Sequence, residues 1–293
     1  MTRLKAKSPK ETTPGKIKML VFSKPGVGKT WLSLDFPSPY YIDSEGGARL
    51  GHYQKKLEKT NGAYLGIADG ALDFQTVLEQ IKALATEKHN YKTLAIGSIT
   101  KLYQTVIANE SERLGEKDVF GASKKPAYAC MRRLFNWMLK LDMNILLEAH
   151  EVVEWGLNPD TGVKEELGVQ ADIWSKVEHE LDLTLRLLKR GHDRIAIIRK
   201  SRLVGFPEGE SFPLTYTEFG ERYGVDFIEA EVTPLTIATK EQTVEIQRII
   251  SRLKIDKKEL DKILSKAKAN SWSDLTNEQA DATIIWLKKK MEV

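Results

Sequence analysis

The stretch that decides the fold is Ser23-Lys24-Pro25-Gly26-Val27-Gly28-Lys29-Thr30. It fits the phosphate-binding pattern G-x-x-x-x-G-K-[ST], in which a glycine-rich turn joins a strand to a helix. Serine replaces the first glycine, which a turn tolerates when the φ angle of the serine is negative. An apolar run at 17–22 precedes the turn and a helical start follows it, so the motif has the surroundings that it requires.

The residues of this loop predict a binding site for ATP and magnesium. Its glycines let successive backbone N–H groups turn toward a phosphate, next to the positive end of the following helix. Lys29 would reach the β- and γ-phosphates, and the Thr30 hydroxyl would ligate Mg²⁺. The predicted contacts come from Ser23, Pro25, Gly26, Val27, Gly28, Lys29 and Thr30.

The composition indicates an ordinary globular protein. Its 293 residues are 41% hydrophobic and 29% charged, which is enough for one sizeable α/β core and a smaller appendage. A single cysteine, Cys130, excludes an internal disulfide and a zinc site of the CxxC kind. No apolar stretch predicts a signal peptide or a membrane span. We therefore expect a protein of the reducing cytoplasm with no membrane partner.

The net charge of +4 is unevenly distributed. Residues 1–18 contain six Lys or Arg against one Glu, and residues 233–293 contain twelve against nine acids. Residues 1–16 are expected to be a disordered basic arm. Basic ends favour a polyanion such as nucleic acid, although lysine-rich ends that only keep the protein soluble explain the charges equally well.

Short apolar runs alternate with amphipathic helical stretches from residue 17 to about 220. This alternation predicts an α/β fold with a mostly parallel central sheet and helices on its faces. Two segments, 114–127 and 151–175, lack steady periodicity and are expected to be long loops. The strands are expected at 17–23, 40–44, 63–68, 93–99, 144–150, 181–189 and 194–199.

The sequence pattern changes near residue 232. Three helical stretches follow, and each opens with a capping-box pattern: Thr239 with Gln242, Asp256 with Glu259, and Thr276 with Gln279. We therefore expect a core domain at 17–232 and a small C-terminal three-helix domain at 233–293.

Cations and aromatic rings gather at the first of the two predicted loops and just after it. Proteins that bind single-stranded DNA use such mixtures, because the cations contact phosphates and the rings stack on bases. The second loop has six acids against Lys164 and is unsuited to phosphates. The solvated start of a helix explains the same residues nearly as well. The predicted DNA contacts are Lys124, Lys125, Tyr128, Arg132 and Arg133.

Three further segments resemble the RecA-like ATPases. Residues 41–47, Tyr-Ile-Asp-Ser-Glu-Gly-Gly, resemble the strand end that presents a glutamate to the attacking water, so Glu45 is the expected catalytic base. Residues 144–150, Asn-Ile-Leu-Leu-Glu-Ala-His, resemble the strand whose last residue, here His150, senses the γ-phosphate and signals to a DNA-binding loop. Lys200 and Arg202 resemble paired cations that reach the nucleotide of an adjacent subunit. A charged edge strand, protected against aggregation, is the alternative interpretation of this pair.

Together, residues 17–220 look most like the Sak-type family of phage nucleotide-binding proteins, which anneal single strands. The segment Trp272-Ser273-Asp274-Leu275-Thr276 is similar to tails of phage recombination proteins. The resemblance implies a RecA-like P-loop NTPase core, ATP-linked binding and annealing of single-stranded DNA, and a homo-oligomeric ring or filament. It also implies a single-strand-binding protein as partner and the host cell cytoplasm as location.

The sequence departs from that family at Gly97. The apolar strand at 92–99 stands where the family has a run ending in Asp-Ser, and that aspartate holds magnesium through its water shell. Asp43 is the candidate to replace it as a metal residue. If this strand lies beside the P-loop strand, we expect slow ATP hydrolysis, and we expect Gly97→Asp to raise the turnover number.

Three functions therefore stay open. The first is an ATPase that acts in DNA recombination, with catalytic residues Lys29, Glu45, His150, Lys200 and Arg202. The second, which Gly97 favours, is a scaffold that binds ATP without hydrolysing it and then binds DNA or a protein. The third is a small-molecule P-loop kinase, which requires an arginine-bearing lid that the sequence does not clearly contain.

Overall fold

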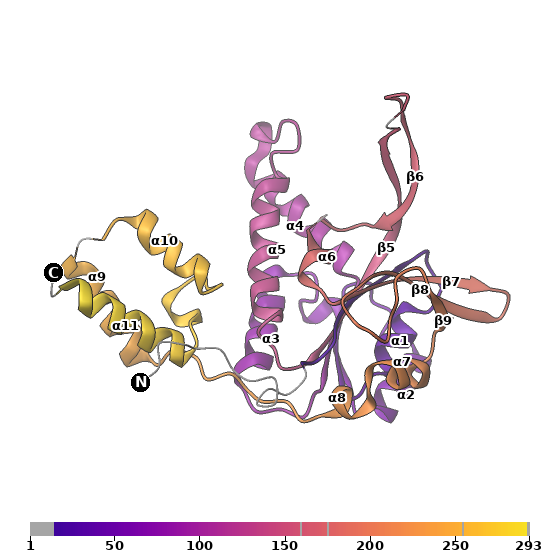
Figure 1. Ribbon diagram of the computed structural model, residues 1–293, viewed down its shortest axis with the longest axis horizontal. Helices are drawn as coiled ribbons and strands as arrows, with labels where there is room; N and C mark the ends of the chain where they lie inside the picture. The colour runs from indigo at the N-terminus through magenta and orange to yellow at the C-terminus, as the bar shows by residue number, and fades with distance from the viewer. Residues whose placement is uncertain (1–14, 159, 175, 254, 292–293) are drawn as a thin grey trace. The chain divides into compact units, whose positions relative to one another are not determined.

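The computed structural model describes residues 15–158, 160–174, 176–253 and 255–291 (Figure 1). Within these residues, one sheet contains the strands β1 (Lys18–Ser23), β2 (Pro39–Asp43), β3 (Ala63–Leu65), β4 (Thr93–Gly97), β5 (Asn144–Leu157), β6 (Lys164–Ala171), β7 (Leu183–Arg190), β8 (Asp193–Ser201) and β9 (Ser211–Pro213). The α-helices are α1 (Lys29–Asp35), α2 (Gly51–Lys59), α3 (Phe74–Thr86), α4 (Ile99–Leu114), α5 (Lys124–Met138), α6 (Val177–Glu180), α7 (Tyr216–Tyr223), α8 (Val225–Glu229), α9 (Lys240–Leu253), α10 (Lys257–Lys266) and α11 (Asn277–Met291). Short 3₁₀ helices lie at η2 (Ile67–Asp69), η3 (Gly115–Lys117) and η4 (Trp272–Asp274).

The sheet places the P-loop strand near its centre. The strand order is β3-β2-β4-β5-β1-β7-β8-β9, and β6 pairs with β5 outside this path. The pairs from β3 to β7 are parallel, whereas β7–β8, β8–β9 and β5–β6 are antiparallel. Central parallel strands are buried on both faces, which explains their continuous apolar runs. The predicted α/β fold with a mostly parallel sheet is confirmed.

The chain divides into two compact units. The first contains the described parts of 1–77, 90–109 and 142–232, and the second contains those of 78–89, 110–141 and 233–293. In the first unit, apolar side chains of β1, β7 and β8 share a buried cluster with residues of α1, α7 and α8. This cluster includes Met19, Val21, Leu32, Phe219 and Ile228. It fixes α1, and therefore the loop that precedes α1, against the sheet.

The C-terminal segment forms the three predicted helices, α9, α10 and α11. Two of the predicted capping boxes are complete. The Gln242 backbone N donates to Thr239 Oγ1 at 3.1 Å, and the Thr239 backbone N donates to Gln242 Oε1 at 2.8 Å. Thr276 and Gln279 make the same reciprocal pair. Asp256 occupies the N-cap of α10 without a side-chain capping bond. A buried cluster within this segment includes Ile246, Ile249, Leu275 and Leu287.

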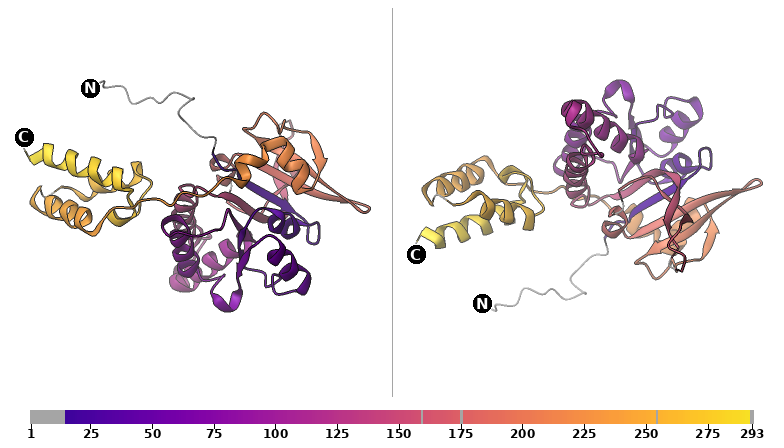
Figure 2. Two further views of the ribbon diagram at one scale, coloured as in Figure 1. Left: turned by 90° about the horizontal axis from the view of Figure 1, so that it is seen from below. Right: turned by 90° about the horizontal axis from the view of Figure 1, so that it is seen from above.

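The second predicted loop is in fact a β-hairpin. β5 does not end at His150 but continues to Leu157, and β6 pairs with it antiparallel from Glu151↔Ala171 to Leu157↔Lys164. A register shift between Glu154 and Trp155 marks a β-bulge. The β5–β6 and β7–β8 hairpins both project beyond the body of the sheet in Figure 1, and Figure 2 shows the β7–β8 hairpin from two further sides. The first predicted loop, 114–127, is also shorter than expected, because α5 begins at Lys124.

The predicted basic arm falls mostly outside the described residues, which begin at Gly15. Lys16, its last residue, is buried, and its Nζ donates to the Ile228 and Ala230 carbonyls. In the part of the chain that the structure describes, no helix has the length and apolar character needed to cross a bilayer.

Candidate nucleotide site

The P-loop lies at the carboxyl end of β1 and leads into α1. Gly26 has φ +73° and Gly28 has φ +119°, left-handed values that side chains with a Cβ rarely adopt. Ser23 is not among the described residues with positive φ, which explains why serine is tolerated at the first position of the motif. Its Oγ donates to the Lys24 carbonyl at 2.8 Å. The local geometry is therefore that of a phosphate-binding turn.

The two functional side chains of the loop are held by neighbouring polar groups. Lys29 is only 8% exposed, and its Nζ donates to Ser23 O at 3.3 Å and Ser23 Oγ at 3.1 Å. Burial lowers the pKa of Lys29, while the nearby carboxylates, that of Glu148 foremost, act to raise it. Thr30 Oγ1 donates to Glu148 Oε2 at 3.0 Å. The lysine and the threonine thus sit next to a carboxylate.

A cleft of about 730 Å³ opens over this loop. Seven of the predicted site residues line it, which brings the P-loop together with the ends of β2 and β5. They are Pro25, Gly26, Gly28, Lys29, Thr30, Glu45 and His150. Four lining residues were not predicted: Trp31, His52, Tyr53 and Arg194. Arg194, from β8, donates through Nε to the Val27 carbonyl at 2.9 Å and so reaches across the loop.

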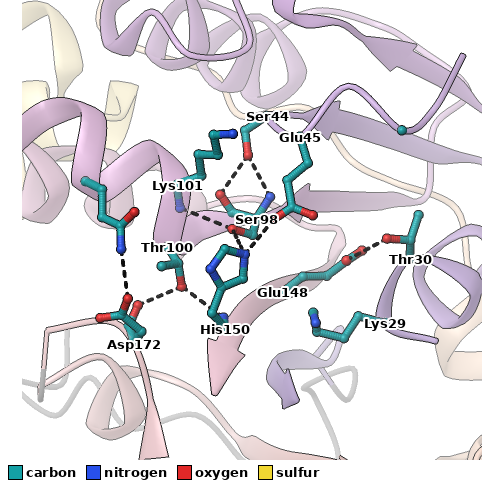
Figure 3. Close-up of polar contacts among 12 residues, drawn as sticks. Lys29, Thr30, Ser44, Glu45, Ser98, Thr100, Lys101, Glu148, His150 and Asp172 are labelled. Carbon is teal, nitrogen blue, oxygen red and sulfur yellow. Dashed lines mark hydrogen bonds and ion pairs between the residues drawn. The ribbon is translucent and has the colours of Figure 1, made fainter. Parts of the chain in front are cut away.

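The predicted catalytic base and the predicted sensor are in direct contact (Figure 3). His150 Nε2 lies 2.5 Å from Glu45 Oε1 and 3.2 Å from Ser98 Oγ. Both side chains are about 40% exposed, so the pair faces the open cleft. The His150 backbone N donates to Thr100 Oγ1, which itself donates to the Asp172 carbonyl at the end of the hairpin. The base, the sensor and the hairpin base therefore belong to one hydrogen-bonded group.

Asp43 has both of its carboxylate oxygens already bound by backbone N–H groups. It is 2% exposed, and its Oδ1 accepts from the backbone N–H groups of Glu45, Gly46 and Gly47, at 2.8–3.2 Å. Its Oδ2 accepts from the Ala48 N–H at 2.7 Å. Both oxygens are engaged by the turn after β2, so the carboxylate fixes this turn and with it Glu45. These bonds favour a structural role for Asp43 over the predicted role as a metal residue.

Glu148 is a site residue that the sequence analysis missed. It is 1% exposed on β5, and burial raises its pKa to about 7, while the Ser33 and Thr30 hydroxyls and Lys29 act to lower it. Ser33 Oγ and Glu148 Oε1 are both buried without a well-formed hydrogen bond among the described residues. A glutamate inside an apolar run of a central strand is the signal that could have revealed it, since buried carboxylates are rare unless paired.

The strand that carries Gly97 is not adjacent to the P-loop strand. β5 lies between β4 and β1, and Gly97 is paired in register with Glu148. A Cβ at position 97 would lie 2.0 Å from the hydroxyl oxygen of Tyr41 and 3.1 Å from Glu148 Cδ. The place of a side chain at 97 is therefore already filled. The premise behind the expected gain from Gly97→Asp is wrong.

A protein-family model described as an AAA domain matches residues 15–213, more than half of the chain. The chain belongs to this AAA-domain family. The match covers β1 to β9 and hence every residue that lines the cleft. With the P-loop geometry, it makes the protein a P-loop NTPase, a class that binds nucleotide and usually Mg²⁺. Comparison with curated protein sequences gives no match.

Two of the solved structures that resemble the AAA-domain protein are distant neighbours. A crystal structure of the RadB recombinase is 17% identical over 67% of this chain and 86% of that chain, with a TM-score of 0.39. A prototypical ATPase from the type III secretion system of pathogenic bacteria is 15% identical over 93% of this chain and 80% of that chain, with a TM-score of 0.37.

The remaining predicted residues of the AAA-domain protein lie outside the cleft. The ammonium of Lys200 contacts the Leu181 carbonyl, and the guanidinium of Arg202 contacts the His179 carbonyl. Both cations thus hold the carbonyls at the carboxyl end of α6. Lys124, Lys125 and Arg132 are exposed on α5, and Tyr128 and Arg133 are half-buried there.

The chemistry of the loop fits Mg²⁺ held together with a phosphate. Among the described residues, no group of three or more His, Cys, Asp or Glu could hold a metal by protein ligands alone. Mg²⁺ at nucleotide sites takes one or two protein oxygens and completes its shell with phosphate oxygens and water. Thr30 Oγ1, with the buried oxygens of Glu148 beside it, supplies such a donor set. When bound, the ion would neutralise charge on the phosphates.

Proposed function

We propose that this protein uses ATP binding and hydrolysis to control its binding of single-stranded DNA, and that it promotes strand annealing as a homo-oligomer. The observation that carries the proposal is the continuity of β5. This strand presents His150 to the nucleotide cleft and then continues as the first strand of the projecting hairpin. A change at the γ-phosphate can therefore reach the hairpin without crossing a flexible linker.

Glu45 and His150 are suited to couple hydrolysis to this change. Attack on the γ-phosphate needs a water molecule held by a nearby acceptor, and Glu45 is the exposed carboxylate of the cleft. His150 now bonds the carboxylate of Glu45. A γ-phosphate oxygen that accepts a hydrogen bond from His150 Nε2 would replace the Glu45 carboxylate as its acceptor and free Glu45 to orient water. The two residues would then switch partners when ATP binds.

Lys29 supplies the positive charge of the site. Its ammonium is held by two oxygens of Ser23 at 3.1–3.3 Å, which are weak, long hydrogen bonds. Phosphate oxygens are stronger acceptors because they carry charge. The lysine would therefore exchange Ser23 for the β- and γ-phosphates at little cost.

The DNA contacts are assigned to the cations of α5. Lys124, Lys125 and Arg132 are exposed and can follow a phosphate backbone. The hairpin is acidic, so it is unsuited to phosphates, but Trp155 at its bulge is 58% exposed and presents a ring on which a base can stack. Lys200 and Arg202 would act across a subunit boundary, and a single-strand-binding protein is the proposed further partner.

The decisive experiment measures DNA binding and its dependence on ATP. We expect the fluorescence anisotropy of a labelled oligo-dT to rise with protein in the presence of Mg²⁺ and a non-hydrolysable ATP analogue, and to fall steeply with salt. Lys124→Ala/Lys125→Ala should reduce the slope of log affinity against log salt by about 1.4, from about 0.7 per lost phosphate contact. The matched control, Lys55→Ala/Lys59→Ala on the exposed side of α2, should leave the slope unchanged.

Each other outcome points to a different function. ATP-dependent DNA binding without release of phosphate would favour the non-hydrolysing scaffold, the alternative that Gly97 suggested. Nucleotide binding with no DNA binding at low salt, with or without nucleotide, would contradict the proposal and favour a small-molecule kinase.

A further inference from the structure

Glu148 and Gly97 occupy equivalent positions on neighbouring strands. They are in-register partners of the parallel pair β4–β5, so a side chain at 97 and the side chain of Glu148 would point to the same face of the sheet. The carboxyl carbon of Glu148 lies 3.1 Å from the place of a Cβ on Gly97. The carboxylate missing at position 97 is thus matched by one that reaches the same region from the next strand.

The hydrogen bond between Glu148 and Thr30 orients the threonine hydroxyl. A hydroxyl has one proton to donate and two lone pairs that accept or coordinate. Thr30 Oγ1 uses its proton for Glu148 Oε2, at 3.0 Å, so its lone pairs are left for other partners (Figure 3). Thr30 lines the cleft, whereas Glu148 lies behind it in the sheet. This arrangement prepares Thr30 as a metal ligand.

The burial of Glu148 also calls for a nearby cation. Its second oxygen has the Ser33 hydroxyl near it but no well-formed hydrogen bond among the described residues, and a weakly paired oxygen of a buried carboxylate is unfavourable. Lys29 is close enough to stabilise the charge, but its ammonium bonds Ser23. A divalent ion on Thr30 would add positive charge on the side of Glu148 that Lys29 does not bond.

We infer that Glu148 is the residue that positions Thr30 and the water shell of Mg²⁺, in the role that the family resemblance gives to an aspartate at position 97. The hydroxyl of Tyr41 fills the space that a side chain at position 97 would need, and it lies 3.3 Å from Thr30 Oγ1. The inference rests on the proposed nucleotide-binding function and names a residue on which its metal dependence relies.

The test compares nucleotide affinity with and without Mg²⁺ by calorimetric titration of a non-hydrolysable ATP analogue. In the parent protein Mg²⁺ should strengthen binding. We call the factor by which Mg²⁺ increases nucleotide affinity the gain from Mg²⁺. In Glu148→Gln, which keeps an oxygen for Thr30 but loses the charge, this gain should fall by about tenfold or more, as for other residues that orient metal ligands. Affinity without Mg²⁺ should stay the same or rise, because a negative charge near the phosphates is removed.

A control variant and a stability measurement separate positioning from mere packing. Glu58→Gln removes an exposed carboxylate of α2 outside the cleft and should keep the full gain from Mg²⁺. Thermal unfolding without nucleotide should show Glu148→Gln to be at least as stable as the parent, since amide burial is easier than carboxylate burial.

The possible failures of the test are distinguishable. An unchanged gain from Mg²⁺ in Glu148→Gln would overturn the inference while leaving nucleotide binding intact. If Glu58→Gln loses the gain to the same extent, the effect is one of general charge and the inference also fails. If the parent protein binds no nucleotide in either condition, the proposed function itself is wrong. Should Glu148→Gln fold poorly, Glu148→Asp offers a second comparison, with a partial loss of the gain expected.

Discussion

The packing around Gly97 predicts that even a methyl group is not tolerated there. In Gly97→Ala the new Cβ would begin 2.0 Å from the Tyr41 hydroxyl oxygen and 2.7 Å from its ring carbon Cζ, against an ordinary separation of about 3.5–4.0 Å. Tyr41 is 2% exposed and cannot turn toward solvent without leaving the core. The strain must therefore be taken up by moving Tyr41 or separating β2 from β4.

The expected size of the effect follows from two contributions. Overpacking of a core costs about 1–3 kcal/mol, and loss of the hydrogen bond between Tyr41 and Thr30 adds about 1 kcal/mol. A total of about 3 kcal/mol corresponds to a fall in melting temperature of roughly 6–12 °C for a core of this size. Gly97→Asp should be worse, because it adds a second carboxylate beside Glu148, and we expect it to lower phosphate release rather than raise it.

The assay is thermal unfolding followed by circular dichroism, with phosphate release measured on the same samples. Gly51→Ala is the matched control, since a Cβ there has nothing within 4 Å. It should change stability by less than about 1 kcal/mol. Tyr41→Leu should restore part of the stability lost in Gly97→Ala. Equal stability of Gly97→Ala and Gly51→Ala, or faster turnover in Gly97→Asp, would refute the assigned packing and with it the role given to Glu148.

Three other variants test the remaining interpretations. Lys29→Ala should weaken ATP binding at least tenfold in a calorimetric titration while the circular dichroism spectrum stays native, and retained affinity would contradict the P-loop assignment. Lys200→Ala/Arg202→Ala should abolish the growth in mass that light scattering is expected to show with ATP and DNA; if both proteins grow alike, the pair serves only to hold the end of α6. A chain lacking 233–293 should keep a folded ATP-binding core, because the C-terminal helices have a buried cluster of their own, and loss of its near-ultraviolet circular dichroism signal would place the domain boundary elsewhere.

The local parts of the site were predictable from the sequence. The P-loop depends on φ angles at Gly26 and Gly28 that few other residues adopt, and the capping boxes of α9 and α11 depend on side chains three residues apart. Such features need no knowledge of distant contacts. The hairpin was missed although Asn158 and Gly162, whose φ is +66°, give a turn signal between two β-rich stretches.

The role of Glu148 could not be derived from local pattern. Its importance depends on which strand separates β4 from β1 and on the register between Gly97 and Glu148, both of which are set by contacts between distant parts of the chain. The predicted metal role of Asp43 is disfavoured for a different reason. Asp43 has the right residue type near the site, but four backbone N–H groups of the following turn already bind its oxygens. Neither the position of Glu148 beside Gly97 nor the hydrogen bonds that occupy Asp43 can be derived from distances along the sequence.

The unbroken course of β5 has a mechanical consequence. The part from Glu151 to Leu157 extends about 23 Å beyond His150, at about 3.3 Å per residue. If the strand pivots by about 5° at the cleft, the tip of the hairpin moves by about 2 Å, several times the displacement of His150 itself. Glu151 forms an ion pair with Arg186 of β7 at 2.8 Å, so β5 is held to the sheet at the base of the hairpin and would pivot there. A sub-ångström adjustment around a phosphate would thus be magnified where Trp155 and its neighbours meet their surroundings.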